Sequence, residues 1–234
     1  PNVAPYVITY NTGGVWEIYQ ATFVQAPAEW GGTNQPGAVE LGFQGRSWFA
    51  ATPQEPSTFW ASKSGNSFDF TTGSNPEDSM SSIVSTKGAV QWMQGQKVML
   101  LGSETVEHSM QGSAQVIAPG DIDIRDESAF GSTGIQAIHI GDQVLYVTRD
   151  GRHVRALSYS NDENAWISRA ITFLAEHITQ YGITELHFAR NPYPCIVALR
   201  GGLGNYRPAM CTYDRGEQVI AWWGLSGYDP QSHA

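Results

Sequence analysis

The chain has 234 residues, of which 41% are hydrophobic and only 15% charged, and its formal net charge is -9. The low charged fraction argues against disorder, and the many Gly and aromatic residues favour short strands joined by tight turns. The acidic balance disfavours nucleic-acid binding through Lys and Arg clusters, and no apolar run approaches the roughly 18 residues that a membrane helix needs.

Residues 1–38 are expected to form a hairpin and part of a blade. Tyr6 to Val24 contains two short strands around the turn sequence Asn11-Thr12-Gly13-Gly14. The apolar residues expected to contribute to the core are Val7, Trp16, Ile18, Tyr19 and Phe23. Because the chain starts at Pro1 without a signal-peptide pattern, we interpret it as a fragment of a longer protein.

Four later segments repeat one order: strand, short turn, apolar strand, turn, amphipathic strand. These units span residues 39–80, 88–126, 134–180 and 182–225. Their apolar middle strands begin near Trp48, Val98, Val144 and Cys195. Successive starts therefore lie 50, 46 and 51 residues apart, and a period of about 48 residues is typical of β-propeller blades.

The turns inside the units contain residues that suit tight chain reversals. They are Gln44-Gly45-Arg46, Gln94-Gly95-Gln96, Gly141-Asp142 and Asn191-Pro192, followed by Thr52-Pro53, Asp150-Gly151 and Gly201-Gly202. Almost continuous apolar residues in the middle strands predict strands covered on both faces, whereas the alternating third strands predict half exposure. The sequence thus predicts an all-β, β-propeller-like repeat of about four to five small antiparallel sheets in a single domain, 1–234. A β-sandwich explains the fixed period less well.

One segment between the third and fourth units departs from strand periodicity. Apolar residues lie at positions 167, 171, 174, 175 and 178, which is helical spacing, and Gly182 suits a helix end. We expect one short helix near 166–180. An extended fourth strand is the alternative.

Common catalytic and cofactor-binding motifs are absent from the sequence. No glycine-rich phosphate loop, H-E-x-x-H or G-x-S-x-G is present. The six histidines include no pair at metal-ligand spacing, and His139 and His187 occupy equivalent positions of the repeat. We therefore assign no catalytic, cofactor-binding or metal residue, expect no cofactor, and expect no enzyme activity.

The densest acidic run is Asp121 to Glu127. In a strand, Asp121, Asp123 and Arg125 would share one face, and Ile122 and Ile124 the other. The carboxylates could hold a cation or act as an acid/base pair on a glycoside. A solvated edge strand or loop is favoured, because the ligand spacing of a calcium loop is missing. The other carboxylates considered, Asp69, Asp142 and Asp150, are isolated.

Aromatic and cysteine residues also have a structural and a functional interpretation. The aromatic set is Trp48, Phe49, Phe59, Trp60, Phe68, Phe70, Trp222 and Trp223. These rings could stack on sugars, but most occupy strand positions, so packing between blades is favoured. Cys195 and Cys211 lie in adjacent predicted strands, and buried free thiols are favoured over a disulfide.

Three segments carry a resemblance to a known family: GRSWFAATPQEPSTFWASKSGNSFDF (45–70), ESAFGSTGIQAIHIGDQVLYVTRDGRHVRALSYS (127–160) and ITFLAEHI (171–178). They resemble the tail nozzle proteins, also called tail tubular protein B, of short-tailed bacteriophages and related prophages. The resemblance covers about residues 31–225. The matching motif positions are Gly45-Arg46, Pro53 to Pro56, Trp60 to Phe70, Ser128 to Ser132 and Val144 to Tyr159.

The resemblance implies a structural virion protein, made in the bacterial host cytoplasm and located in the tail. Six copies of the full-length protein would form a ring that holds and releases double-stranded DNA without binding it tightly. Expected partners are other copies of the protein, the tail adaptor or gatekeeper protein and tail fibres, with no membrane span and no active site. An acidic wall agrees with this role because it repels phosphates. Family members are usually far longer, so this chain would lack domains that build the tube.

Two alternatives from other classes stay open. A lectin-like propeller would recognise host surface glycans, but its binding residues should repeat in each unit, and the loop residues differ between units. A glycan-active enzyme needs titratable groups that converge in a cleft, and the sequence offers only the acidic run and isolated carboxylates. The tail protein is therefore the favoured interpretation.

Overall fold

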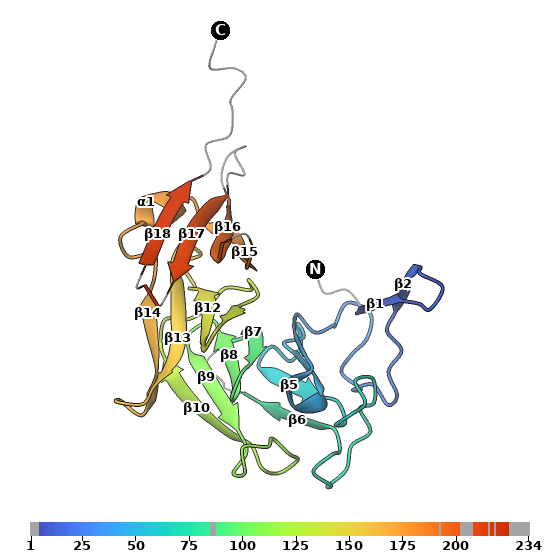
Figure 1. The fold of residues 1–234 in the computed structure, drawn as a ribbon. Coiled ribbons are helices and arrows are strands. Elements are labelled where there is room, and N and C mark those ends of the chain that lie inside the picture. Colours follow the sequence, from blue (N-terminus) through green and yellow to red (C-terminus); the bar gives the residue numbers. More distant parts are fainter. Residues whose placement is uncertain are drawn as a thin grey trace. The chain divides into compact units, whose positions relative to one another are not determined.

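The computed structural model describes residues 5–84, 88–191, 193–201, 208–214, 216–217 and 219–224. The chain divides into two compact units, Pro1–Asp126 and Glu127–Ala234, which we describe separately. The described residues form antiparallel strands with one 3-10 turn and one short α-helix (Figure 1). The expected all-β fold of small antiparallel sheets is confirmed, whereas the single domain over 1–234 stays a prediction.

The first unit contains a hairpin and two four-stranded sheets. The hairpin pairs β1 (Tyr6–Tyr10) with β2 (Trp16–Gln20). One sheet contains β3 (Ala38–Leu41), β4 (Ser47–Ala50), β5 (Thr58–Ala61) and β6 (Met80–Ile83), with the 3-10 turn η1 (Phe43–Gly45) before β4. The other contains β7 (Val90–Gly95), β8 (Met99–Ser103), β9 (Glu107–Gln111) and β10 (Asp123–Ser128). The last residues of β10 lie past the boundary of the first unit at Asp126.

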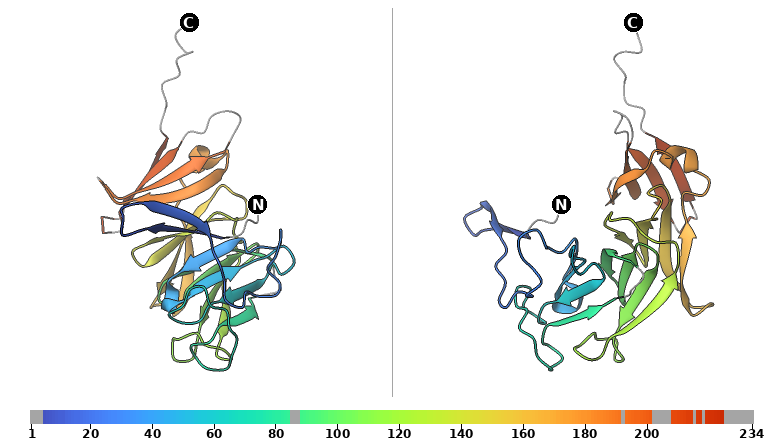
Figure 2. Two further views of the ribbon diagram at one scale, coloured as in Figure 1. Left: turned by 90° about the vertical axis from the view of Figure 1, so that its right-hand side faces the viewer. Right: turned by 180° about the vertical axis from the view of Figure 1, so that it is seen from behind.

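The second unit contains two more four-stranded sheets and the short helix (Figure 2). One sheet is built from β11 (Ile138–Ile140), β12 (Gln143–Val147), β13 (Val154–Ser160) and β14 (Ala165–Ala170). The other contains β15 (Ile183–Ala189), β16 (Cys195–Arg200), β17 (Ala209–Asp214) and β18 (Val219–Gly224). Helix α1 (Glu176–Thr179) lies between β14 and β15 in the chain.

The four larger sheets coincide with the four predicted repeat units. In each sheet the strands pair in chain order, which is the meander of a propeller blade. The second strands begin at Ser47, Met99, Gln143 and Cys195. Each start lies within one residue of its predicted position, although the sequence pattern separated only three strands per unit and the structure has four.

Burial follows the predicted gradient in part of the structure. Strands β4, β8 and β12 are buried at every position, as expected for strands covered on both faces. The expectation was wrong for the fourth middle strand, β16, because only its face with Ile196 and Ala198 packs into a core. The third strand β17 alternates between buried and accessible positions along most of its length, whereas β9 is almost completely buried. Half exposure therefore holds for some third strands and not for all.

Each unit has its own hydrophobic core. The first is built around Trp48, Phe59, Met93, Leu101 and Met110, and the second around Leu145, Val154, Leu186, Ile196 and Ala209. A smaller aromatic cluster in the first unit joins Phe49, Trp60 and Phe70 to Phe23 and Trp30. Packing is thus the role of most of the predicted aromatic set, but Phe68 (38%) and Trp223 (42%) are exposed.

The region near 166–180 contains both predicted alternatives. A short helix is present but occupies only Glu176–Thr179. The start of the helical pattern forms β14 instead, which pairs with β13 from Ser160↔Ala165 to Arg155↔Ala170. The edge of β13 carries backbone N–H and C=O groups that need hydrogen-bond partners. Pairing these groups with β14 outweighs the weak helical preference of residues 165–170.

The N-terminal hairpin has the predicted turn but not the predicted burial. Asn11 N–H donates to the Val15 carbonyl (2.9 Å), and Asn11 Oδ1 accepts from the N–H groups of Gly13 and Val15 (3.0 Å each). Of the apolar residues expected in the core, Phe23 packs into the aromatic cluster, whereas Trp16, Ile18 and Tyr19 are exposed. The expectation was wrong for these three, because alternation identifies a face of a strand without showing that anything covers it.

Most other predicted turns are present. Gly141 and Gly151 adopt the positive φ angles (65° and 71°) that favour glycine. The turn predicted at Gln94-Gly95-Gln96 begins later than expected, because Gln94 and Gly95 are the last residues of β7. The chain reverses at Gln96, whose N–H donates to the Val98 carbonyl (2.9 Å). The predicted turns with Pro192 and Gly202 fall partly outside the described residues.

Candidate functional site

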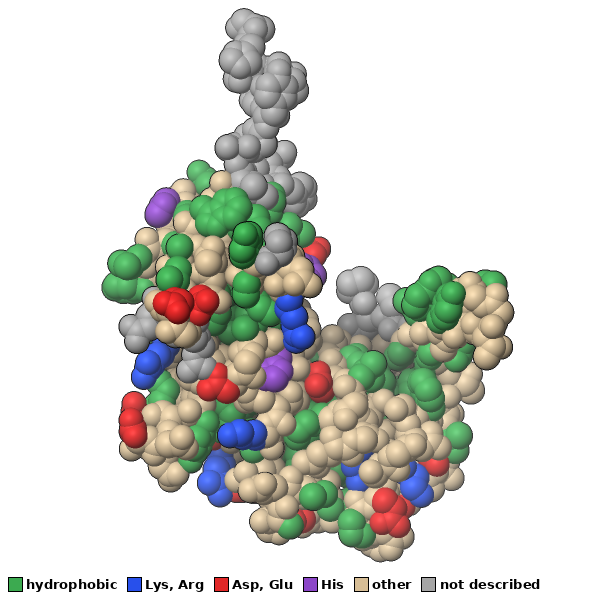
Figure 3. Space-filling model, in the orientation of Figure 1, with side chains coloured by type: hydrophobic (Ala, Val, Ile, Leu, Met, Phe, Trp, Pro, Cys, Tyr) green, Lys and Arg blue, Asp and Glu red, His purple; other side chains and the backbone are tan. Residues whose placement is uncertain are grey.

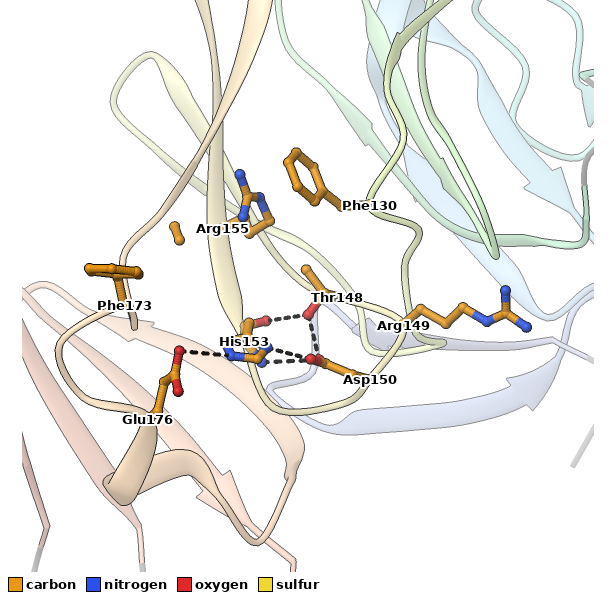
Figure 4. Close-up of a pocket in the computed structure, with 9 residues that line it drawn as sticks. Phe130, Thr148, Arg149, Asp150, His153, Arg155, Phe173 and Glu176 are labelled. Carbon is orange, nitrogen blue, oxygen red and sulfur yellow. Dashed lines mark hydrogen bonds and ion pairs between the residues drawn. The ribbon is translucent and has the colours of Figure 1, made fainter.

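An open cleft of about 600 Å³ lies beside the β12–β13 turn in the second unit (Figure 4). Its lining residues are Phe130, Thr148, Arg149, Asp150, His153, Arg155, Ala170, Phe173 and Glu176. They come from the segment before β11, the β12–β13 turn, strands β13 and β14, and the connection from β14 through α1. The volume lies within the roughly 300–1,000 Å³ of ligand pockets, so this cleft is the candidate site.

The β12–β13 turn holds Asp150 in a fixed position. Its Oδ1 accepts from Thr148 Oγ1 (2.6 Å) and from the backbone N–H groups of Arg152 (3.0 Å) and His153 (3.3 Å). Its Oδ2 contacts His153 Nδ1. Burial raises the pKa of Asp150, but the hydrogen bonds and the nearby imidazole outweigh burial and lower that pKa to about 2. The turn therefore presents an ionised carboxylate to the cleft.

His153 connects this turn to helix α1. Its Nε2 lies 3.5 Å from Glu176 Oε1, while its Nδ1 faces Asp150. Figure 4 shows the imidazole between the two carboxylates. These three side chains form one wall of the cleft.

Arg155 forms the opposite wall together with Phe130. The guanidinium carbon lies 3.3 Å from the centroid of the Phe130 ring, in a cation–π arrangement. Its Nε donates to Ser168 Oγ (2.9 Å) and its Nη2 to the Ser168 carbonyl (2.7 Å), and Tyr146 hydroxyl also contacts Ser168 Oγ (2.8 Å). The guanidinium is therefore held in one orientation by β14.

The cleft combines groups that can bind a polar ligand. Phe173 is 71% exposed and offers an open ring face, and Figure 4 places it away from Phe130 across the cleft. Carboxylates can accept hydrogen bonds from hydroxyl groups, and a guanidinium can donate hydrogen bonds to them. Thr148 is the one hydroxyl among the described lining residues, and it donates to Asp150. This set suits non-covalent binding of a ligand that is rich in hydroxyl groups.

The acidic run Asp121 to Glu127 is separate from this cleft in sequence and has structural contacts of its own. Asp121 accepts from Ser113 N–H and Oγ, and these hydrogen bonds lower the pKa of Asp121. Arg125 Nη2 pairs with Asp123 Oδ2 at 2.6 Å. Ile122 and Ile124 pack against the core of the first unit. Strand β10 is the outer strand of its sheet, so the edge-strand interpretation is confirmed.

The remaining predicted residues are distributed over several elements. His108 is buried, with its Nδ1 3.0 Å from Asp126 Oδ1, and His187 contacts Glu185 (2.9 Å). His233 lies outside the described residues. Cys195 and Cys211 are free, and burial raises the pKa of the Cys211 thiol to about 12. Among the described residues, no group of three or more His, Cys, Asp or Glu could hold a metal ion, and no helix is long and apolar enough to cross a membrane.

Sequence reasoning missed the cleft residues. It treated Asp150 as an isolated carboxylate and gave His153 no role. A local signal did exist, because Arg149, Arg152 and Arg155 lie close together around a turn in an otherwise acidic chain. Phe130 and Glu176 had no such signal, since only folding brings them to this turn.

Comparisons with known proteins do not identify the chain. No family model matches it, and no curated protein matches it. Among solved structures, Hsv2 of Kluyveromyces lactis is similar, with 12% sequence identity, a TM-score of 0.41, and coverage of 94% of this chain and 68% of that one. A likeness at this level is too low to carry an argument about function. The tail nozzle resemblance thus stays a hypothesis.

Proposed function

We propose that this propeller-type chain is a structural component of a short phage tail, a nozzle or tail tubular protein that forms part of the DNA-ejection conduit. The observation that carries the proposal is the position of Arg46, the charged residue of the first family-like motif. Its side chain is 2% exposed. A charged residue that is buried in this way supports a structural role for the motif.

Arg46 bonds to backbone carbonyls at both ends of the β5–β6 connection. Its Nη1 donates to the carbonyls of Ser62 (2.5 Å) and Asp78 (2.7 Å), and its Nη2 donates to the carbonyl of Pro76 (2.5 Å). Lys63 Nζ also pairs with Asp78 Oδ1 (3.1 Å). The guanidinium thus satisfies carbonyls of the β5–β6 connection that no sheet ladder reaches.

The second family-like motif has a similar role in the second unit. Ser132 forms an isolated bridge with Thr148, and Arg149 N–H donates to the Gly131 carbonyl (3.0 Å). Gly131 has a φ angle of 71°, which favours glycine. The S-A-F-G-S segment therefore attaches to the end of β12, which again supports an architectural motif.

Labelling of virions tests the proposal directly. Antibodies raised against the purified chain should label the tails of short-tailed particles from a lysate that contains the protein, as seen by electron microscopy. Antibodies against a capsid protein serve as the positional control. Label absent from particles, or confined to unassembled host protein, would contradict the proposal.

Duplex DNA binding gives an independent test of the conduit role. A net charge of -9 predicts weak binding, because phosphates are repelled rather than neutralised. Fluorescence anisotropy with a labelled duplex at physiological salt should show no tight complex. Submicromolar binding would contradict a channel through which DNA slides.

The cleft of the second unit favours one second candidate function, binding of glycans by a lectin-like propeller. Phe173 can stack on a sugar, while Arg155 and Glu176 can bond its hydroxyl groups. If this candidate holds, a glycan array should detect binding that Phe173→Ala abolishes. Tyr181→Ala changes a comparably exposed aromatic residue (66%) outside the cleft and should leave binding intact. An array without any specific glycan would remove this candidate.

A further inference from the structure

The β1–β2 hairpin has an apolar face that nothing in the described chain covers. Residues directly opposite each other in an antiparallel pair share a face, and Ile8 pairs with Ile18 while Tyr10 pairs with Trp16. With Tyr6, these side chains form what we call the ridge. Its exposures are 60% for Tyr6, 62% for Ile8, 62% for Tyr10, 68% for Trp16 and 68% for Ile18. Figure 3 shows hydrophobic side chains gathered over this hairpin.

Contacts within the hairpin hold the shape of the ridge, although no other described element packs substantially against it. The Asn11 hydrogen bonds fix the turn, and the Tyr10 and Trp16 rings lie 5.0 Å apart. Glu17 is on the opposite face, where Asn11 Nδ2 donates to its Oε1 (2.6 Å), so the ridge itself carries no charge. Neither strand packs substantially against another described element. An isolated two-stranded hairpin is at best marginally stable in water, so a covering partner would stabilise it.

The second unit has an apolar cleft of a complementary kind, which we call the groove. It has a volume of about 380 Å³ and lies beside β18 and the connection from β14 to α1. Leu174 (88%), Phe173 (71%) and Ile220 (50%) expose large side chains along it. Trp222 forms a rigid wall, because its Nε1 donates to the Ile171 carbonyl (2.9 Å). His177 is its one titratable lining residue among those described.

We infer that the ridge of one copy of this chain docks into the groove of another copy. The ridge residues together expose on the order of 600–700 Å² of mainly apolar surface, close to the roughly 800 Å² that each partner contributes to a stable interface. Patches of that size are rare on monomers unless they bind something. The ridge is a protruding apolar face, and the groove is a concave surface lined mainly by apolar side chains.

The geometry of this contact determines how copies assemble. Each copy carries one ridge and one groove, so every surface is satisfied only where the copies close on themselves, either as a reciprocal pair or as a larger head-to-tail ring. The inference therefore deepens the proposed function by naming the surfaces through which copies join, and only ring closure rests on that function. Sedimentation of the purified chain tests the contact, whereas virion labelling tests the function, so each can fail alone.

The experiment uses the 234-residue chain and two variants, one in each surface. The ridge variant is Ile8→Ser with Ile18→Ser, and the groove variant is Leu174→Ser with Ile220→Ser. Matched controls are Tyr19→Ser, on the opposite face of the hairpin, and Tyr181→Ser, outside the groove. All of these positions are at least 49% exposed, and circular dichroism checks that each variant is folded.

Analytical ultracentrifugation should show concentration-dependent association of the wild type and of both controls. Either surface variant alone should weaken association by about tenfold or more, as expected when central interface residues are removed. A mixture of the ridge and groove variants should form one-to-one pairs and nothing larger, because one intact ridge and one intact groove remain. A monomeric wild type, variants that associate normally, or a mixture without pairs would each overturn the inference.

Discussion

The hairpin and the β3–β6 sheet of the first unit use similar residues with opposite results. Trp48 and Phe49 of β4 are 0% and 4% exposed, whereas Trp16 and Ile18 of β2 are both 68% exposed. Strand β4 lies between β3 and β5, and its two faces pack against separate clusters. Among the residues that the structure describes, the hairpin has no third strand and no opposing layer. Burial of an alternating strand is thus decided by its neighbours and not by its own pattern.

The largest expected difference between the two regions is in stability. Trp48→Ala should reduce the free energy of unfolding by about 3–5 kcal/mol, because it leaves a cavity in a closed core. Trp16→Ala should change it by less than about 0.5 kcal/mol, since the ring is already in water. Urea unfolding at low protein concentration measures both. Equal losses would show that the hairpin belongs to a core.

Arg46 adds a second contrast between the two regions. It is a buried charged residue in the first unit's β3–β6 sheet region, whereas the hairpin turn is held by the neutral side chain of Asn11. Arg46→Ala should cost roughly 3 kcal/mol, since the carbonyls of Ser62, Pro76 and Asp78 lose a charged donor and those of Ser62 and Asp78 stay buried. Arg152→Ala removes an exposed arginine and serves as the control. Similar unfolding midpoints for the two variants would contradict the structural role of the motif.

The smallest expected effect is a pH dependence of stability. It distinguishes the β12–β13 turn, which Asp150 holds, from the hairpin turn, which Asn11 holds. The folded-state pKa of Asp150, about 2, lies below its ordinary value of 3.8. Its contribution is therefore full above about pH 4 and is lost as the pH falls toward 2. The side chain is 40% exposed, so solvent screening keeps the effect below about 1 kcal/mol. Asp150→Asn should flatten the pH dependence of the unfolding midpoint in this window.

Asn11 provides the contrast for that measurement. It holds the hairpin turn with a neutral amide, so Asn11→Ala should leave the slope between pH 4 and 2 unchanged. An Asp150→Asn variant with the wild-type slope would show that the carboxylate does not stabilise the turn.

Much of the fold was predictable from local pattern. The turn residues and the apolar middle strands located four sheets, because glycine chemistry and continuous apolar runs act within a few residues. The fourth strands were harder to predict. Strand β14 has a helical distribution of apolar residues and is recruited by the edge of β13, which no local pattern encodes.

The candidate cleft was much less predictable. Asp150 and His153 share one turn, but Phe130 and Glu176 lie about 20 residues away in either direction. Spacing along the chain indicates side chains that share a strand or a turn. It does not show which connections between strands converge on a cleft.

By itself, the sequence determined the all-β class, the period of about 48 residues and the positions of the four second strands, because these depend on alternation and turn chemistry. Only the tertiary structure decided that Arg46 lies buried among carbonyls, that His153 lies between two carboxylates, and that the ridge is exposed. Those outcomes depend on which surfaces meet. Contacts between distant segments are a property of the folded chain as a whole.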